Sequence, residues 1–278
     1  MRPRPSCRRC GSAGCWGAEV EFANVVAGLG VGLVVGMTGV GGGALMTPIL
    51  VLLFGVAPGA AVGTDLWFAA ITKMFGGAMH HSRGSVDWGV LKLLCAGSLS
   101  TSLLTLWWLH AAGAQQLRSG LILHLLGLVL VLTALAMIFK RQAHALGKAL
   151  RINAAERFKA WQPALTVLAG AILGLLVTLT SVGAGALGAV MLVYLYPFRL
   201  TPPRLVGTDI VHAIPLTVVA GTGHALMGNV NLALLGELLL GSIPGILIGS
   251  TLAGKIPETG LRWAIAVVLS LVAFKLLL

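Results

Sequence analysis

Two long uncharged segments constrain this chain more than any other feature of its sequence. Residues 22–54 and 163–196 contain no aspartate, glutamate, lysine or arginine. Each is longer than the roughly 20 apolar residues that cross a bilayer as one helix. Each also contains a glycine-rich interruption, at residues 38–43 and 180–185, and clustered glycines do not sustain a helix in the membrane interior. The two segments therefore predict membrane helices that are broken near their middle.

The composition excludes a soluble domain and a disordered chain. Hydrophobic residues make up 57% of the 278 residues and charged residues 10%, against about 25% charged residues in soluble domains. The mean hydropathy is +0.95. The other apolar segments lie at residues 60–80, 88–110, 118–139, 204–226, 232–252 and 261–278. We expect an all-α polytopic membrane protein.

One broken segment followed by three ordinary segments occurs twice along the chain. The matching sequences are TGVGGGAL at 38–45 with TSVGAGAL at 180–187, Gly63-Thr64-Asp65 with Gly207-Thr208-Asp209, and His80 with His224. Internal duplication is a common construction of secondary transporters. We predict two homologous transmembrane repeats, residues 22–139 and 163–278, each with about four hydrophobic segments of which the first is broken at the glycine-rich motif.

Basic residues flank the repeats and predict their orientation. The formal net charge is +11, and the positive charges concentrate in a tail at residues 1–21 and a linker at residues 140–162, as Arg2, Arg4, Arg8, Arg9, Lys140, Arg141, Lys148, Arg151, Arg157 and Lys159. Cytoplasmic loops carry such an excess. We expect the tail, the linker and the C-terminus to face the cytoplasm of a prokaryotic plasma membrane, which requires each broken segment to cross once. Re-entrant hairpins are the alternative and would make the repeats inverted. This distribution indicates membrane topology, and no nucleic-acid partner is expected.

The cysteines do not indicate a metal or redox site. Cys7, Cys10 and Cys15 lie in the tail, Cys95 lies in an apolar segment, and no histidine precedes His80. Disulfides are not expected in a reducing compartment, and a zinc site needs a fourth ligand. We predict neither a metal nor a cofactor.

The glycine-rich breaks are candidate anion sites. An unwound stretch presents backbone N–H groups and a helix N-terminus to a cavity, although close helix packing is an alternative use of membrane glycines. The candidate substrate-binding residues are the breaks, the neighbouring hydroxyls and Lys73, namely Thr38, Gly39, Gly41, Gly42, Gly43, Thr64, Lys73, Thr180, Ser181, Gly183, Gly185 and Thr208.

Ionisable groups inside the spans are costly and often functional. Lys73 would attract an anion, or it would form a salt bridge to Asp65 or Glu237. Candidate proton-coupling residues are Asp65, His80, Asp209 and His224. The alternatives are carboxylates that stabilise a first helical turn and histidines at the membrane interface.

The order and duplication of these motifs resemble the sulfite exporter family, TauE/SafE. The matching residues are Thr38 to Gly43, Pro48, Gly63-Thr64, Leu66, His80, Gly84 and Val86, with 180–185, Gly207-Thr208, His224, Gly228 and Val230 in the second half. The resemblance covers residues 22–278. It implies a plasma-membrane carrier of sulfite, sulfoacetate or a related organosulfonate, driven by the proton gradient.

We therefore predict a transporter whose partners are a small anionic substrate and the lipid bilayer, with a homodimer left open. A divalent cation or another small anion is the alternative cargo, because Asp65 and Asp209 could coordinate a metal ion. An enzyme is not expected, since Ser181 is not set in the G-x-S-x-G pattern of a serine hydrolase.

Overall fold

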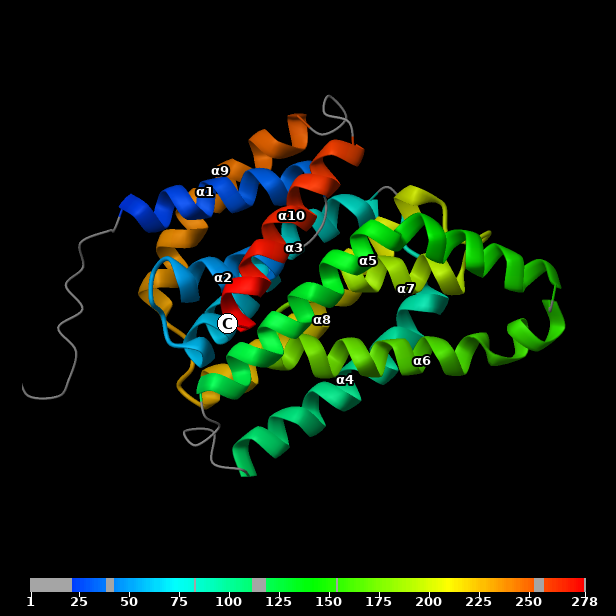
Figure 1. Cartoon of the computed structure of the whole chain (residues 1–278), viewed down its shortest axis with the longest axis horizontal. Coiled ribbons are helices and arrows are strands. Elements are labelled where there is room, and N and C mark those ends of the chain that lie inside the picture. The colour runs from blue at the N-terminus through cyan, green and yellow to red at the C-terminus, as the bar shows by residue number, and fades with distance from the viewer. Residues whose placement is uncertain are drawn as a thin grey trace, which may run out of the picture.

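The computed structural model describes residues 22–38, 43–82, 84–111, 119–153, 155–252 and 258–277. These residues form helices joined by short connections (Figure 1). The helices are α1 (Phe22–Thr38), α2 (Gly43–Leu52), α3 (Pro58–Ser82), α4 (Trp88–Ala111), α5 (Ser119–Asn153), α6 (Ala155–Thr180), α7 (Ala186–Leu195), α8 (Pro202–Leu226), α9 (Leu232–Leu252) and α10 (Glu258–Leu277).

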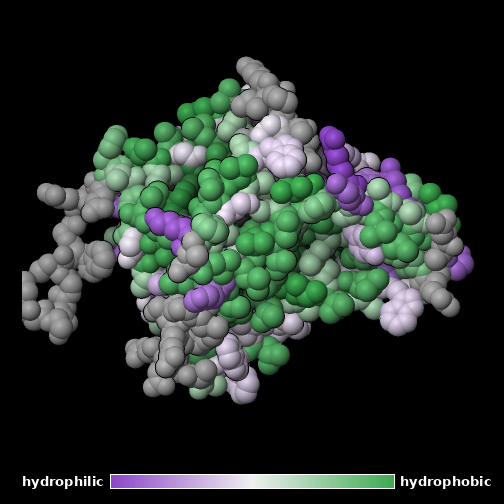
Figure 2. All heavy atoms as spheres, viewed as in Figure 1, coloured by the Kyte–Doolittle hydropathy of each residue, from purple (hydrophilic) through white to green (hydrophobic). Residues whose placement is uncertain are grey.

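Their length and apolar surface are those of a multi-pass membrane protein. Within the described residues, 5 helices are long and apolar enough to cross a membrane, and shorter apolar helices accompany them. Large hydrophobic side chains such as Leu104, Trp107, Leu135 and Phe274 are exposed. Hydrophobic residues cover much of the visible face, and most of the visible hydrophilic residues lie on its right-hand part, with a few at the left (Figure 2). In a bilayer, this apolar surface contacts lipid rather than water.

The end of α5 and the start of α6 lie together at one end of the molecule (Figure 1). Helix α5 runs through the basic stretch to Asn153, and α6 begins at Ala155. This connection lies at the right of Figure 1, and we call that end of the bundle the linker end.

The second broken segment folds back on itself. Gln162, near the start of α6, donates a hydrogen bond of 2.5 Å to the carbonyl of Leu195 at the end of α7. The hydroxyls of Thr166 and Tyr196 are 2.8 Å apart. Helices α6 and α7 therefore form a re-entrant hairpin that enters and leaves at the linker end. The single crossing expected from the count of basic residues is wrong for this segment, because packing of α7 beside the start of α6 reverses the chain.

Glycines allow two pairs of helices to pack at backbone contact. Gly28 of α1 lies against the carbonyl of Leu238 in α9, and Gly32 lies against that of Ser242. Gly170 and Gly174 of α6 lie in the same way against Leu94 and Ser98 of α4. A Cβ atom at any of these glycines would overlap the facing backbone. Because residue numbers increase together along each pair, α1 runs parallel to α9 and α6 runs parallel to α4.

Helices α3 and α8 are antiparallel. Gly63, near the start of α3, contacts the backbone of Asn229 just after α8, and Gly207, near the start of α8, contacts Ser85 just after α3. Helices α5 and α10 are antiparallel as well, since Gly127 near the start of α5 contacts Leu277.

These directions place both ends of the described chain opposite the linker. Helix α10 ends beside the start of α5, and α1 starts on the same side as α9, next to the end of α8. We call this side the terminal end, and it lies at the left of Figure 1. The end of α10 and the α5–α6 connection therefore lie at opposite ends of the molecule, contrary to the expectation that the linker and the C-terminus share one side, and the tail lies outside the described residues. The chain makes three crossings between the start of α3 and the end of α5, so the linker follows on the other side.

Candidate functional site

A buried lysine binds the break between α6 and α7. Lys73 of α3 is only 5% exposed, and its Nζ donates a hydrogen bond of 2.8 Å to the carbonyl oxygen of Ala184. Lys73 lies in the first half of the sequence, and the packing of α3 on α8 brings its side chain to this break in the second half. An ammonium inside the bilayer region requires such a polar partner.

Two buried carboxyl groups lie within electrostatic range of Lys73. Asp65 of α3 is fully buried, and Thr47 of α2 donates a hydrogen bond of 2.5 Å to its Oδ2. Asp209 of α8 is also buried, and its Oδ1 lies against Gly188 of α7, where a larger residue would overlap it. The ammonium of Lys73 interacts with both carboxyl groups. Neither Asp65 Oδ1 nor Asp209 Oδ1 has a hydrogen-bond partner among the described residues.

Glu237, the other residue considered as a partner of Lys73, accepts a hydrogen bond of 2.6 Å from Asn24. It thus joins α9 to α1. The carboxyl groups that act on Lys73 are those of Asp65 and Asp209.

The break itself has an unusual backbone and a buried serine hydroxyl. Ser181, Gly183 and Gly185 have φ angles of 59°, 118° and 143°, in a region that favours glycine and strains Ser181. Thr180 donates to the carbonyl of Leu176 and accepts from the N–H of Val182. The Ser181 hydroxyl is buried and interacts with the carboxyl group of Asp65, although it makes no hydrogen bond of standard geometry within the described chain. Of the two hydroxyls predicted here, Ser181 is the one that can exchange this interaction for one with a ligand.

The start of α7 adds positive potential to the same place. No side chain hydrogen-bonds the N-terminus of α7 at its N-cap, Gly185. The first N–H groups of a helix have no intrahelical acceptor, and together with the helix dipole they attract anions. Lys73, Ser181 and the start of α7 are therefore three kinds of donor that meet at one break.

Thr64 and Thr208 are engaged elsewhere. The N–H of Asn231 donates to the Thr64 hydroxyl over 3.1 Å, and the N–H of Asp87 donates to the Thr208 hydroxyl over 2.9 Å. Asn231 and Asp87 precede α9 and α4 and accept hydrogen bonds from the first turns of these helices. Both threonines thus hold a helix start against the neighbouring helix.

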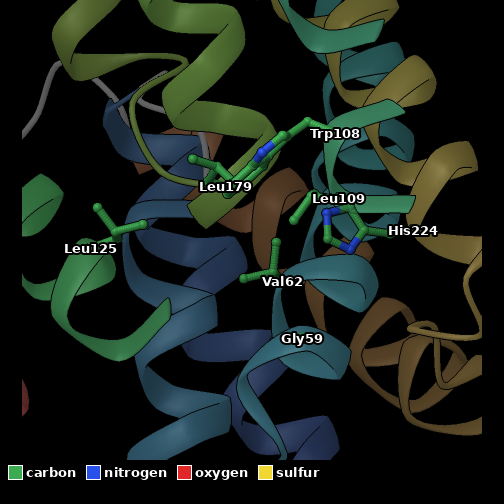
Figure 3. A pocket seen from close by; sticks show the side chains of 7 residues that line it. All are labelled: Gly59, Val62, Trp108, Leu109, Leu125, Leu179 and His224. Carbon is green, nitrogen blue, oxygen red and sulfur yellow. The ribbon is translucent and has the colours of Figure 1, made fainter. Parts of the chain in front are cut away.

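His224 lines a small apolar cavity toward the terminal end (Figure 3). Its Nε2 lies 2.9 Å from the carbonyl oxygen of Thr178, and its Nδ1 has no partner among the described atoms. The cavity has a volume of about 70 Å³. Its walls are formed by Gly59, Val62, Trp108, Leu109, Leu125, Leu179 and His224. Because Leu179 precedes the break directly, the cavity lies between the buried charges and the terminal end.

Several predicted residues fall beyond what the structure describes. Gly39, Gly41 and Gly42 lie outside the described residues. Thr38, Gly43 and His80 belong to α1, α2 and α3, but their surroundings are not described. The part of the site formed by the first break therefore stays a prediction.

His212, Ser98 and Thr47 were not among the site residues predicted from the sequence. His212 is completely buried on α8, and its Nε2 lies 2.9 Å from the Ser98 hydroxyl of α4. The one available signal was spacing, since His212 follows Asp209 by a single helical turn. No group of three or more potential metal ligands occurs within the described segments.

The fold and the site define a class of protein: a multi-pass helical membrane protein with charged groups buried at a broken helix, as in membrane transporters. The chain belongs to the sulfite exporter TauE/SafE family, whose model matches residues 24–276. It is therefore a transporter-family protein and not an enzyme.

Two proteins of Bacillus subtilis (strain 168) are similar to this chain. One is the probable membrane transporter protein YjnA, 40% identical over 218 residues, which are 76% of this chain and 81% of YjnA. The other is the probable membrane transporter protein YunE, 30% identical over 113 residues, which are 40% of this chain and 38% of YunE. No solved structure matches significantly.

Proposed function

We propose that this chain is a secondary-active transporter of a small sulfur-containing anion, namely sulfite, sulfoacetate or a related organosulfonate, and that transport is coupled to protons. The observation that carries the proposal is the buried ammonium of Lys73 at the α6–α7 break. The family adds the sulfur chemistry, since its name is that of a sulfite exporter.

The donors at the break suit an anion with several oxygens. An incoming anion would replace the Ala184 carbonyl as the hydrogen-bond acceptor of the Lys73 ammonium. It would also accept hydrogen bonds from the Ser181 hydroxyl and from the N–H groups at the start of α7. Sulfite and sulfonate groups carry three oxygens, so one oxygen is available for each kind of donor. Charge-assisted hydrogen bonds to such oxygens contribute about 1.5–3 kcal/mol each.

The carboxyl groups provide the argument for proton coupling. Asp65 and Asp209 both interact with the single ammonium of Lys73. If both were ionised, an anion at Lys73 would add a further negative charge to a buried site, which is strongly unfavourable in a low-dielectric medium. Protonation of one carboxyl removes this repulsion. Anion binding and proton binding therefore favour each other.

We propose further that the two predicted repeats are inverted. Paired contacts support this architecture, because the contact of Thr64 with Asn231 corresponds to that of Thr208 with Asp87. The contact of Gly28 with Leu238 corresponds in the same way to that of Gly170 with Leu94. Equivalent helices such as α3 and α8 run in opposite directions, as in transporters whose repeats are related by an axis in the membrane plane.

We also propose that the linker end faces the cytoplasm and that both termini face outward. The described lysines and arginines at the linker end are Lys92, Lys140, Arg141, Lys148, Arg151, Arg157, Lys159, Arg199, Arg204 and Arg262, whereas Lys275 lies near the terminal end. The arginines of the tail lie outside the described residues. Because the described positive charges concentrate at the linker end, the positive-inside rule favours a cytoplasmic linker end.

A divalent-cation carrier is the second candidate. The free oxygens of Asp65 and Asp209 favour it, because carboxylate oxygens are the usual ligands of hard cations. The ammonium of Lys73 between these carboxyl groups opposes it, since a cation would have to displace or neutralise that charge.

Net anion uptake into proteoliposomes tests the proposal. Purified protein is assayed with sulfite, sulfoacetate, sulfate, thiosulfate, chloride and Mn²⁺, with a pH-sensitive dye trapped inside the vesicles. We expect saturable flux of sulfite or an organosulfonate, accelerated by a proton gradient and accompanied by proton movement. Flux of Mn²⁺ alone would establish the second candidate, and anion flux without proton movement would contradict the coupling.

A further inference from the structure

His212 is a fully buried titratable group with one unused nitrogen. It lies on α8 with 0% of its surface exposed. Its Nε2 lies 2.9 Å from the Oγ of Ser98 on α4. Its Nδ1 has no hydrogen-bond partner among the described residues. A buried imidazole that served only to join α8 to α4 would have no need of a bare second nitrogen.

The ring belongs to the charged site by position. Asp209 lies three residues earlier on α8, so the two side chains are neighbours on one helix face, and Asp209 Oδ1 also has no partner in the described part of the chain. The ammonium of Lys73 acts electrostatically on both residues. The site therefore contains one ammonium, one imidazole and two carboxyl groups.

The helices packed against α8 bring few other charges to this region. From α3 come Lys73 and Asp65, and from α5 comes Lys140, which acts on Asp209. On α4, Cys95 lies one turn before Ser98, while Lys92 is exposed near the linker end. Helix α7 contains no charged residue, and α6 carries its charges in its first turns, at Glu156, Arg157 and Lys159.

We propose that His212 is the group that carries the co-transported proton, with Ser98 as the positioning residue that holds its ring. In the empty site, the charge of Lys73 opposes a second positive charge on the imidazole. A bound anion neutralises Lys73, and Nδ1 then accepts a proton from water on the side to which the site is open. The imidazolium is stabilised by the anion and by Asp209, and it returns the proton on the opposite side when the anion leaves.

This inference deepens the proposed function and rests on proton-coupled anion transport. It assigns the proton to the imidazole, whereas the carboxyl groups alone would otherwise carry it. Coupling of anion and proton transport is therefore preserved only if the side chain at position 212, beside Lys73, can bind and release a proton.

Variants of His212 and Ser98 test the assignment in proteoliposomes. His212→Gln retains a polar atom near Nε2 for Ser98 but cannot be protonated near neutral pH. We expect it to keep anion counterflow, in which no net proton movement is needed, while proton flux per transported anion falls to about a third or less of the wild-type value. Ser98→Ala should keep coupling and move the pH midpoint of transport by about one unit. Ser102→Ala is the matched control, because Ser102 is buried one turn further along α4 and accepts its hydrogen bond from Thr178.

The outcomes separate the two levels of the proposal. If the wild-type protein transports anions without protons, the proposed function fails. If the wild type is coupled and a folded His212→Gln protein moves as many protons per anion, the role of His212 is overturned. If His212→Gln does not fold, the pH midpoint of transport in Ser98→Ala decides. A midpoint equal to that of the wild type and of Ser102→Ala overturns the inference. A shift that occurs in Ser98→Ala but not in Ser102→Ala supports it.

Discussion

At the scale of single residues, Lys73 determines the charge of the buried site. Its ammonium lies 2.8 Å from the Ala184 carbonyl oxygen and acts on two aspartates. If the ammonium binds substrate, Lys73→Met should weaken anion affinity by about tenfold or more, the loss expected for one charge-assisted hydrogen bond. Lys73→Arg should retain partial function, since the charge remains but its geometry changes. Anion affinity measured by isothermal titration checks this, with Lys92→Met, an exposed lysine of α4, as the control.

A structural role for Lys73 leads to a different result. Removing the ammonium would then lower the thermal midpoint, and adding Asp65→Asn would recover it because one buried negative charge would be removed as well. A stable Lys73→Met protein with unchanged affinity would eliminate this residue from the binding site.

Asp87 links charge to stability at the linker end. Two hydrogen bonds of 2.7 and 2.8 Å join its carboxylate to Arg199. Burial by itself raises the pKa of Asp87, but hydrogen bonds from Arg199 and from the N–H of Val90 lower it below its ordinary value of 3.8. The resulting stabilisation is present above the ordinary pKa and is lost as the pH falls through the lower folded-state value.

Asp87→Asn should therefore lower the thermal midpoint at pH 7, and the difference should disappear as the pH falls through the folded-state pKa of Asp87, which lies below 3.8. Asparagine still caps α4, so the change in thermal midpoint reports the loss of the negative charge. An ion pair with an exposed arginine contributes at most about 1 kcal/mol to the free energy of unfolding. Thermal unfolding in detergent between pH 7 and 3 measures it. Arg204→Gln, an exposed arginine nearby, is the control. A difference that persists at low pH would show that the charge of Asp87 is not the cause.

At the scale of elements, the re-entrant hairpin depends on the backbone of its break. Gly183 has φ 118°, and an alanine held there would cost about 1–3 kcal/mol. Gly183→Ala should reduce transport strongly while membrane insertion persists, because strain would move Ser181 and Ala184 away from Lys73. Gly236→Ala on α9 is the matched control, since open space surrounds that position. Flux normalised to inserted protein is the measurement, and equal rates for the two variants would count against a site at this break.

At the scale of the whole molecule, orientation is the property that a simple experiment can decide. With the linker end inside, the C-terminus beyond Leu277 is outside. Alkaline phosphatase fused to the C-terminus should be active and green fluorescent protein fused there should be dark, because each reporter matures on one side of the membrane. The opposite pattern would place the C-terminus inside and refute the proposed orientation.

The sequence by itself determined the class of protein, because hydropathy and charge are local properties. Uncharged segments, Gly-Thr-Asp motifs and the TauE/SafE pattern predicted membrane helices and the family, and both are confirmed. The same local information placed Lys73, Asp65 and Asp209 among the candidate residues before their contacts were known. Substrate and coupling remain predictions.

Only the tertiary structure decided how these pieces meet. The reversal of α7 beside α6 depends on contacts such as Thr166 with Tyr196, and the same hydropathy is compatible with one crossing or a hairpin. No sequence pattern paired His212 with Ser98, which α4 brings to its ring. Thr64 and Thr208, although adjacent to the aspartates in sequence, are directed to helix starts from the other half of the chain. The physical reason is that helix direction and side-chain partners are set by long-range packing of backbone against glycine, which no local window of sequence contains.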